Sequence, residues 1–249
     1  MNSKFEAGVE DVYLAVSSGR PVRDHGPYGI LVSDERLEFY PRVVAEPIVS
    51  GMQILEVAGA VNRDECLLYQ VQPSGVLDAV RPEQSVDLRA CGAEKFIVFR
   101  GDRSYRFVLN QHSLNWGVSH ISGGTLKKLA DVPAMTHDVW LNEHERPARL
   151  VEDKELVNLA ETGIEHFETK AILIAIIVNA RKKEVDHRQL TYWEIVRLAF
   201  PEAQPSDNVI YSIEYAFGPH QNPEGRLVEG QTVFVREGMK FYVSPTDKS

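Results

Sequence analysis

The chain has 249 residues, of which 43% are hydrophobic and 25% are charged, the balance of an ordinary globular protein. Its net charge is −9 and it has no basic stripe, which argues against binding to nucleic-acid phosphates or anionic lipid, so we expect neither nucleic acid nor membrane as a partner. The longest apolar run is far shorter than the ~20 residues that cross a bilayer, and the polar start has no signal-peptide core, which together predict a cytoplasmic protein.

The first segment, residues 1–24, is polar and ends in turn-forming residues such as Gly19 and Pro21. It carries no sustained apolar face, and we therefore predict a mobile leader. The apolar residues between Val9 and Val16 leave a short helix as the alternative.

Two strands and a helix follow the leader. The strands are predicted at Tyr28–Val32 and Leu37–Phe39, joined by a tight turn at Ser33–Glu35. The helix is predicted to begin at Ser50, whose side chain can form a capping box with Gln53. Further strands are predicted at Cys66–Val71, Ser85–Leu88 and Lys95–Phe99.

The helix pattern then returns twice, starting at Ser122 and at Thr191, with a period of about 70 residues. Apolar residues lie four, seven and eight positions after each start, on one helix face. They are Ile54, Val57 and Ala58, then Leu126, Leu129 and Ala130, then Ile195, Leu198 and Ala199. A second signature keeps the same period: Val86, Leu88, Gly92 and Phe96, then Val157, Leu159, Gly163 and Phe167, then Val233, Val235, Gly238 and Phe241. Two signatures with one period indicate triplication of a small domain that is long enough to fold alone.

The later repeats have the same element order as the first. Their strands are predicted at Tyr105–Leu109, Ser113–Trp116, His137–Leu141, Leu156–Leu159 and His166–Thr169, then at Ile172–Val178, Lys183–Asp186, Val209–Tyr215, Gln231–Val235 and Lys240–Val243. A hairpin crossing one amphipathic helix, with further strands completing a mixed sheet, buries each half-apolar face. The sequence therefore predicts an α+β fold of three β-grasp domains, at residues 25–99, 100–169 and 170–243.

The three helix starts differ in quality. Thr191 and Glu194 repeat the capping box, whereas Ser122 is followed by Gly123 and Gly124, which each cost up to about 1 kcal/mol relative to alanine. We therefore predict that the middle domain is the least stable. The connections between domains are short, which favours a preferred orientation over loose tethers.

Catalytic and metal-binding patterns are not evident. Histidines gather in the middle repeat, at His112, His120, His137, His144 and His166, without ligand spacing, and we interpret them as surface residues. The two cysteines, Cys66 and Cys91, are expected to be reduced and buried, a disulfide or a reactive role being the less favoured alternatives. The acidic group at Glu152–Glu155 is expected in a loop, and the glycines before each last strand in turns that need a positive φ.

Two features of the third repeat remain open to a functional interpretation. Some of its aromatic residues must lie in the core, and those that remain exposed would form a docking patch. These aromatic residues are Tyr192, Trp193, Tyr211, Tyr215 and Phe217. The last strand is predicted to end at Val243, because Pro245 blocks further pairing, so residues 244–249 should project as an exposed tail.

Several phrases in order resemble the bacterial multiubiquitin family over about residues 25–249. They are Val49–Gly59, Leu68–Val71, Ser85–Leu88, Glu94–Phe96, Ile177–Asn179, Gly230–Gln231, Gly238–Phe241 and Thr246–Ser249. The family consists of tandem ubiquitin-like proteins encoded beside E1-like, E2-like and peptidase proteins.

The resemblance implies a protein modifier that is a substrate and not a catalyst. Its carboxyl end would be activated by the E1-like enzyme, which uses ATP, and passed through the E2-like protein to an acceptor, with no cofactor in the chain itself. The residues of this conjugation tail would be Pro245, Thr246, Asp247, Lys248 and Ser249. They differ from the diglycine end of ubiquitin, so the tail would either pass as it is or be trimmed by the peptidase. The internal junctions also lack diglycine, which argues against release of single units.

Two other functions stay open. The three repeats would also suit a non-covalent scaffold whose repeated faces bind partners with avidity. An enzyme built on one repeat is the third hypothesis, and no group of residues in the sequence supports it.

Overall fold

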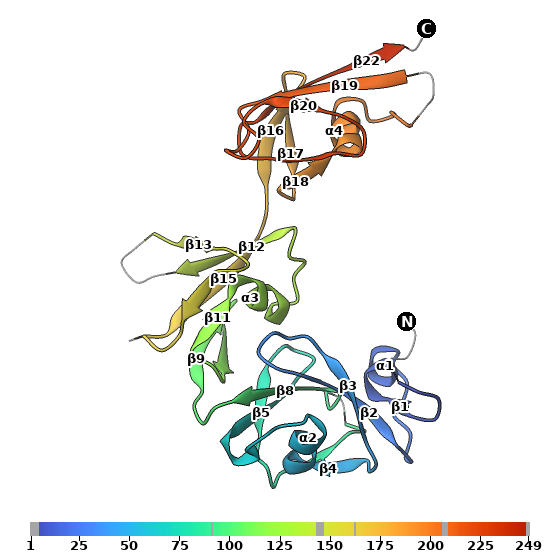
Figure 1. The fold of residues 1–249 in the computed structure, drawn as a ribbon, viewed down its shortest axis with the longest axis vertical. Helices are drawn as coiled ribbons and strands as arrows, with labels where there is room; N and C mark the ends of the chain where they lie inside the picture. The colour runs from blue at the N-terminus through green and yellow to red at the C-terminus, as the bar shows by residue number, and fades with distance from the viewer. Residues whose placement is uncertain (1–4, 91, 143–146, 162, 206–208, 248–249) are drawn as a thin grey trace. The chain divides into compact units, whose positions relative to one another are not determined.

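The computed structural model describes residues 5–90, 92–142, 147–161, 163–205 and 209–247. The chain divides into two compact units (Figure 1). One unit comprises Met1–Val132 with Val139–Thr169 and holds the first two repeats, and the other comprises Pro133–Asp138 with Lys170–Ser249 and holds the third. No helix in the described ranges is long and apolar enough to cross a membrane.

Each repeat is built from the same series of elements. The first has β2 (Tyr28–Ser33), β3 (Tyr40–Val44), β4 (Ile48–Ser50), α2 (Gly51–Val57), η1 (Arg63–Glu65), β5 (Cys66–Val71), β6 (Leu77–Val80), β7 (Ser85–Asp87) and β8 (Lys95–Arg100). The second has β9 (Tyr105–Leu109), β10 (His112–Trp116), β11 (His120–Ser122), α3 (Gly123–Leu129), β12 (His137–Asn142), β13 (Arg149–Val151), β14 (Leu156–Asn158) and β15 (Glu165–Ala171). The third has β16 (Ile174–Val178), β17 (Arg181–Val185), β18 (Gln189–Thr191), α4 (Tyr192–Ala199), β19 (Val209–Ala216), β20 (Gly225–Leu227), β21 (Thr232–Phe234) and β22 (Lys240–Asp247).

The three main sheets have one topology. The strand orders that they share are β3-β2-β8-β5-β6, β10-β9-β15-β12-β13 and β17-β16-β22-β19-β20, and in the first sheet β1 (Glu10–Asp11) also pairs with β2. In each sheet the first and last strands of the repeat are parallel neighbours, as in the pairs β2 with β8, β9 with β15 and β16 with β22. A separate pair of short strands, β4 with β7, β11 with β14 or β18 with β21, accompanies each sheet. The predicted fold, three tandem β-grasp domains of α+β class, is confirmed.

The helix starts follow the sequence prediction closely. Ser50 and Thr191 form complete capping boxes with Gln53 and Glu194, while Ser122 accepts a hydrogen bond from the Thr125 amide without a box. The residues four positions after each start, which are Ile54, Leu126 and Ile195, are fully buried. The helical spacing therefore identified the core face in all three repeats.

Gly123 has a different role from the one expected. A Cβ atom at Gly123 would lie 2.4 Å from the Glu152 carbonyl oxygen, and one at Gly51 would lie 2.3 Å from the Arg81 carbonyl oxygen. In the first two repeats the glycine therefore lets the helix start pack directly on a neighbouring turn. The acidic residues after β13 form this turn, as predicted for a loop between strands.

The predicted second strand at Leu37–Phe39 is wrong. Residues 34–39 form the connection, in which Leu37 has a positive φ of 55° and its amide bonds to the Asp34 carbonyl, and β3 begins at Tyr40. The other predicted strands are present with small shifts at their ends, except the last one, which extends four residues past its predicted end at Val243. The short strands β4, β6, β11, β13, β18 and β20 were not predicted.

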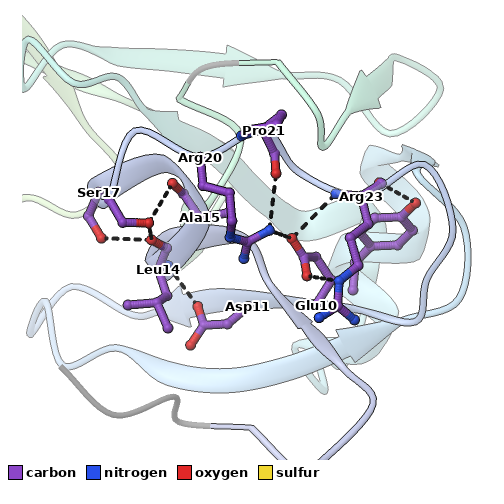
Figure 2. A network of polar contacts seen from close by, with 10 residues as sticks. Glu10, Asp11, Leu14, Ala15, Ser17, Arg20, Pro21 and Arg23 are labelled. Atoms are coloured by element: carbon purple, nitrogen blue, oxygen red, sulfur yellow. Dashed lines mark hydrogen bonds and ion pairs between the residues drawn. The ribbon is translucent and has the colours of Figure 1, made fainter.

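The predicted mobile leader is also wrong over the described part of residues 1–24, where the alternative of a short helix holds, while residues 1–4 lie outside the described residues. Residues 10–11 form β1 (Glu10–Asp11), parallel to β2, and are followed by α1 (Val12–Ser17). The Glu10 side chain is 1% exposed and binds Arg20 at 2.6 Å and Arg23 at 2.9 Å (Figure 2). Paired charges and the fully buried Val12 attach this segment to the core of the first repeat.

The first two repeats share a hydrophobic core. Tyr69, Ile97 and Phe99 of the first repeat belong to one buried cluster with the core of the second repeat. The Phe99 ring lies 4.7 Å from the Trp116 ring, centroid to centroid, in an edge-to-face arrangement. The first two repeats therefore form one packed body. For this pair of repeats, the preferred mutual orientation that we predicted is present.

Candidate functional site

The end of the third repeat carries the predicted conjugation tail. Strand β22 does not end at Val243 but continues to Asp247, paired antiparallel with β19 (Figure 1). Ser244 pairs with Ser212 and Thr246 with Ile210. The expectation that residues 244–247 project without a pairing partner is therefore wrong. Lys248 and Ser249 lie outside the described residues.

Strand pairing continues through Pro245 because of the direction in which its nitrogen points. In register, Pro245 faces Tyr211, whose N–H and C=O both bond to the Tyr192 hydroxyl, at 3.1 and 2.7 Å. The Tyr211 backbone groups thus point away from β22, which makes Tyr211 and Pro245 a non-hydrogen-bonded pair of the antiparallel ladder. The proline removes no bond to β19, since its nitrogen faces the opposite side.

The hydroxyl group of Tyr192, the first residue of α4, binds the outer edge of β19. The Tyr192 side chain is 4% exposed, and burial raises the pKa of its hydroxyl group. A neutral hydroxyl can both accept from the Tyr211 N–H and donate to the Tyr211 C=O, as the distances require.

Asn179 fixes the point at which β22 stops pairing with β16 while it continues along β19. Its side chain accepts from the Val243 N–H and donates to the Val243 C=O, both at 2.8 Å. Asn179 has a φ of 48° and begins the turn after β16. Its side-chain amide therefore forms the hydrogen bonds to β22 that a further residue of β16 would form if the parallel ladder continued. Val243 and Phe241 are 5% and 1% exposed, and this part of β22 is therefore anchored on both edges and in the core.

The second repeat contains the same device. Asn110, with a φ of 48°, accepts from the Thr169 N–H and donates to the Thr169 hydroxyl, both at 2.8 Å. Sequence reasoning missed both asparagines. The available signal was an Asn directly after an apolar strand in two repeats, a residue that tolerates positive φ in turns.

Beyond Val243 the environment of β22 changes. The ladder between β16 and β22 ends at Val178 and Phe241. For residues 244–247, β19 is the only paired strand within the described ranges. The side chains of Ser244, Pro245 and Thr246 are exposed. Residues 244–247 are therefore an extended segment that pairs with β19 along one edge and exposes the side chains of residues 244–246.

The other polar candidates sit on surfaces. His112, His120 and His166 are exposed and His137 is half-buried, whereas His144 lies outside the described residues. No group of three or more potential metal ligands occurs among the residues described. In the acidic turn, Asp153 forms an ion pair with Lys127 at 2.7 Å, and Glu155 pairs with Arg149. These contacts are structural.

The cysteines and glycines have ordinary surroundings. Cys66 is a free, half-buried thiol whose pKa is raised by burial, which disfavours a reactive thiolate. Cys91 lies outside the described residues. Gly92, Gly163 and Gly238 have φ values of 88°, 135° and 75°, as the turn prediction required.

The aromatic residues of the third repeat are mostly part of its core. Tyr192 is buried, and Trp193, Tyr211 and Tyr215 pack against the same cluster. Phe217 is 59% exposed, and the Lys240 ammonium lies 4.9 Å from its ring centroid. A single exposed ring remains of the predicted aromatic patch.

The comparisons with known proteins identify the same three repeats. A family model described as Multiubiquitin matches residues 34–101, 105–171 and 174–247. The third match therefore includes the whole of β22. None of the curated proteins searched matches the chain.

Proposed function

Since this chain belongs to the multiubiquitin family, with three tandem ubiquitin-like repeats, we propose that it is a cytoplasmic protein modifier. In this proposal an E1-like enzyme joins the carboxylate at the end of the chain to the AMP part of ATP and releases pyrophosphate. An enzyme thiol then displaces AMP to form a thioester, and the acyl group passes through an E2-like protein to a nucleophile on the acceptor. The chain itself is the substrate of these steps.

The observation that carries the proposal is the position of the last strand of the third family match. In β22 the core residues end at Val243, and the exposed residues 244–246 extend beyond the part that Asn179 holds. A globular body whose last strand runs past its core suits an adenylating enzyme, because the body can dock while the chain end, once released from β19, enters the active site.

The composition of the tail adds a condition. Asp247, Lys248 and Ser249 occupy the place of the diglycine end of ubiquitin. In this proposal, side chains at these positions require either a wider channel than glycine does or trimming by a peptidase of the same pathway.

The experiment mixes the full chain with E1-like and E2-like proteins of the kind that the family resemblance implies, ATP and a cell extract as the source of acceptors. We expect an ATP-dependent adduct that survives denaturing electrophoresis. Removal of residues 245–249 should abolish it, while a matched variant of an exposed residue in the same repeat, Val228→Ser, should retain it. Adduct formation by the truncated chain would contradict the tail assignment, and absence of any adduct from the full chain would contradict the modifier function.

A non-covalent scaffold is the second candidate, and one observation favours it. The shared core of the first two repeats gives them a fixed geometry, which benefits multivalent binding. A scaffold would bind a partner tightly without ATP and release it in denaturant. The ATP requirement of the complex thus separates the two candidates.

A further inference from the structure

Strand β22 is held in two different ways on either side of Val243. Up to Val243, β22 pairs with β19 on one edge, and on the other edge it pairs first with β16 and then, at Val243, binds the Asn179 side chain. Its inward side chains are buried in the core. After Val243, it is held by β19 residues 209–212 alone, within the described part of the chain. The exposed side chains of Ser244, Pro245 and Thr246 add little packing.

We propose that residues 244–247 form a latch on β19, which must open at a hinge directly after Val243 before the chain end can be activated. The inference rests on the proposed modifier function. It adds a resting state to that function, in which the carboxyl end is withheld by an intramolecular strand pair, and an open state in which the segment is free.

The register places the hydrogen bonds of the latch. Because Tyr211 and Pro245 form a non-hydrogen-bonded pair, the flanking pairs, Ser212 with Ser244 and Ile210 with Thr246, are the hydrogen-bonded ones. The amides of Ser244 and Thr246 therefore face β19. Pro245 offers no N–H on the other edge, so a third strand cannot complete a ladder there.

The same pairing explains why activation requires opening. An enzyme channel that encloses the last residues must surround the main chain. In the latched state β19 occupies one edge of that chain as far as the pair of Val209 and Asp247. The hinge follows from the Asn179 clamp, since this side chain holds both backbone groups of Val243 and leaves Ser244 as the first residue that only β19 holds among the described residues.

Hydrogen exchange of the full chain, resolved by residue, tests the latch without any enzyme. Tyr242, Ser244 and Thr246 all pair with β19, Tyr242 before the hinge and Ser244 and Thr246 after it. The amides of Ser244 and Thr246 should exchange at least about tenfold faster than that of Tyr242, yet more slowly than in an unstructured peptide of the same sequence. Equal protection of all three would overturn the hinge, and no protection of Ser244 and Thr246 would overturn the resting pair.

A reversible lock tests the need for opening. Ser212→Cys with Ser244→Cys joins a hydrogen-bonded pair, whose Cα atoms lie about 5.5 Å apart, within the range of a disulfide. The variant is made in a background with Cys66→Ser and Cys91→Ser. The matched control, Glu214→Cys with Arg226→Cys, joins an exposed pair between β19 and β20 and leaves the latch free.

The outcomes separate the latch from the modifier function. The oxidised lock should form the adduct at least about tenfold more slowly than its reduced form, and the control should not respond to oxidation. An oxidised lock that reacts as fast as its reduced form overturns the latch. Failure of the unmodified chain to form any adduct overturns the modifier function, and hydrogen exchange then still decides whether the latch exists.

Discussion

Replacing Asn179 with glycine should weaken the third repeat through the loss of two hydrogen bonds and little else. Glycine accepts the φ of 48° at this position, so the backbone of the turn is kept while the bonds to the Val243 N–H and C=O disappear. Each neutral hydrogen bond contributes about 0.5–1.5 kcal/mol, which gives a loss of about 1–3 kcal/mol in the free energy of unfolding.

A second variant separates the clamp from the backbone conformation. Asn179→Ala loses the same two bonds and also places a Cβ at a left-handed position, which costs about 1 kcal/mol more than glycine does there. The expected order of stability is therefore wild type, then Asn179→Gly, then Asn179→Ala. The matched control is Asn110→Gly, which removes the equivalent clamp from the second repeat and so from the other compact unit.

Native-state hydrogen exchange is the suitable assay because it reports on each repeat separately. A loss of about 1–3 kcal/mol accelerates exchange by a factor of about 5–160 if it occurs through opening. The acceleration should appear at the Val243 amide and in β16 for Asn179→Gly, and in the second repeat for the control. If the Val243 amide of Asn179→Gly stays as protected as in the wild type, the clamp does not hold β22 and the hinge argument loses its fixed point.

Three further predictions concern the first two repeats. Burial raises the pKa of Glu94, whose Oε2 has no hydrogen-bond partner among the residues that the structure describes. The folded state therefore holds this proton more tightly than the unfolded state, and its stability falls as pH rises through the folded pKa. Glu94→Gln should therefore raise the urea midpoint of the first repeat at pH 7 and leave it nearly unchanged at about pH 4; a gain of equal size at both pH values would contradict this. Gly123→Ala should lower the melting temperature although alanine is the better helix former, because its Cβ would meet the Glu152 carbonyl, and a rise would show that the turn moves away freely. Phe99→Ala should cost about 3–5 kcal/mol and accelerate exchange in both the first and second repeats, whereas a change confined to the first would argue against a shared core.

The sequence was sufficient to predict those elements whose apolar residues recur regularly, at helical spacing in the helices or at every second position in the strands. The caps at Ser50, Ser122 and Thr191 and the buried residues four positions later were predictable because helical spacing specifies them locally. Strand β9 has the predicted bounds, since its alternating apolar residues are flanked by turn signals.

Short elements were missed because their length leaves no period to detect. Strands such as β4 and β11 have three residues each, directly before a helix, and are defined by a partner far away in the sequence.

The packing of the N-terminal segment was missed for an electrostatic reason. Glu10 looks like a solvent-exposed residue in the sequence, but Arg20 and Arg23 neutralise it in the folded chain, so a polar segment packs as part of a core.

The tail prediction failed because the effect of a proline on a strand depends on the direction of its nitrogen. Sequence shows that Pro245 lacks a donor but not which edge that donor would have faced. Here the register is set by Tyr211, whose backbone groups are taken by Tyr192 from another element, a relation that no local pattern reveals. One residue thus has two consequences: it permits β22 to run on along β19, and it denies a third strand the bond that would bury the segment in a sheet. A chain end that pairs on one side only is the condition for a latch that can both hold and open, and with a non-proline residue at position 245 the open edge would gain a donor and lose that restriction.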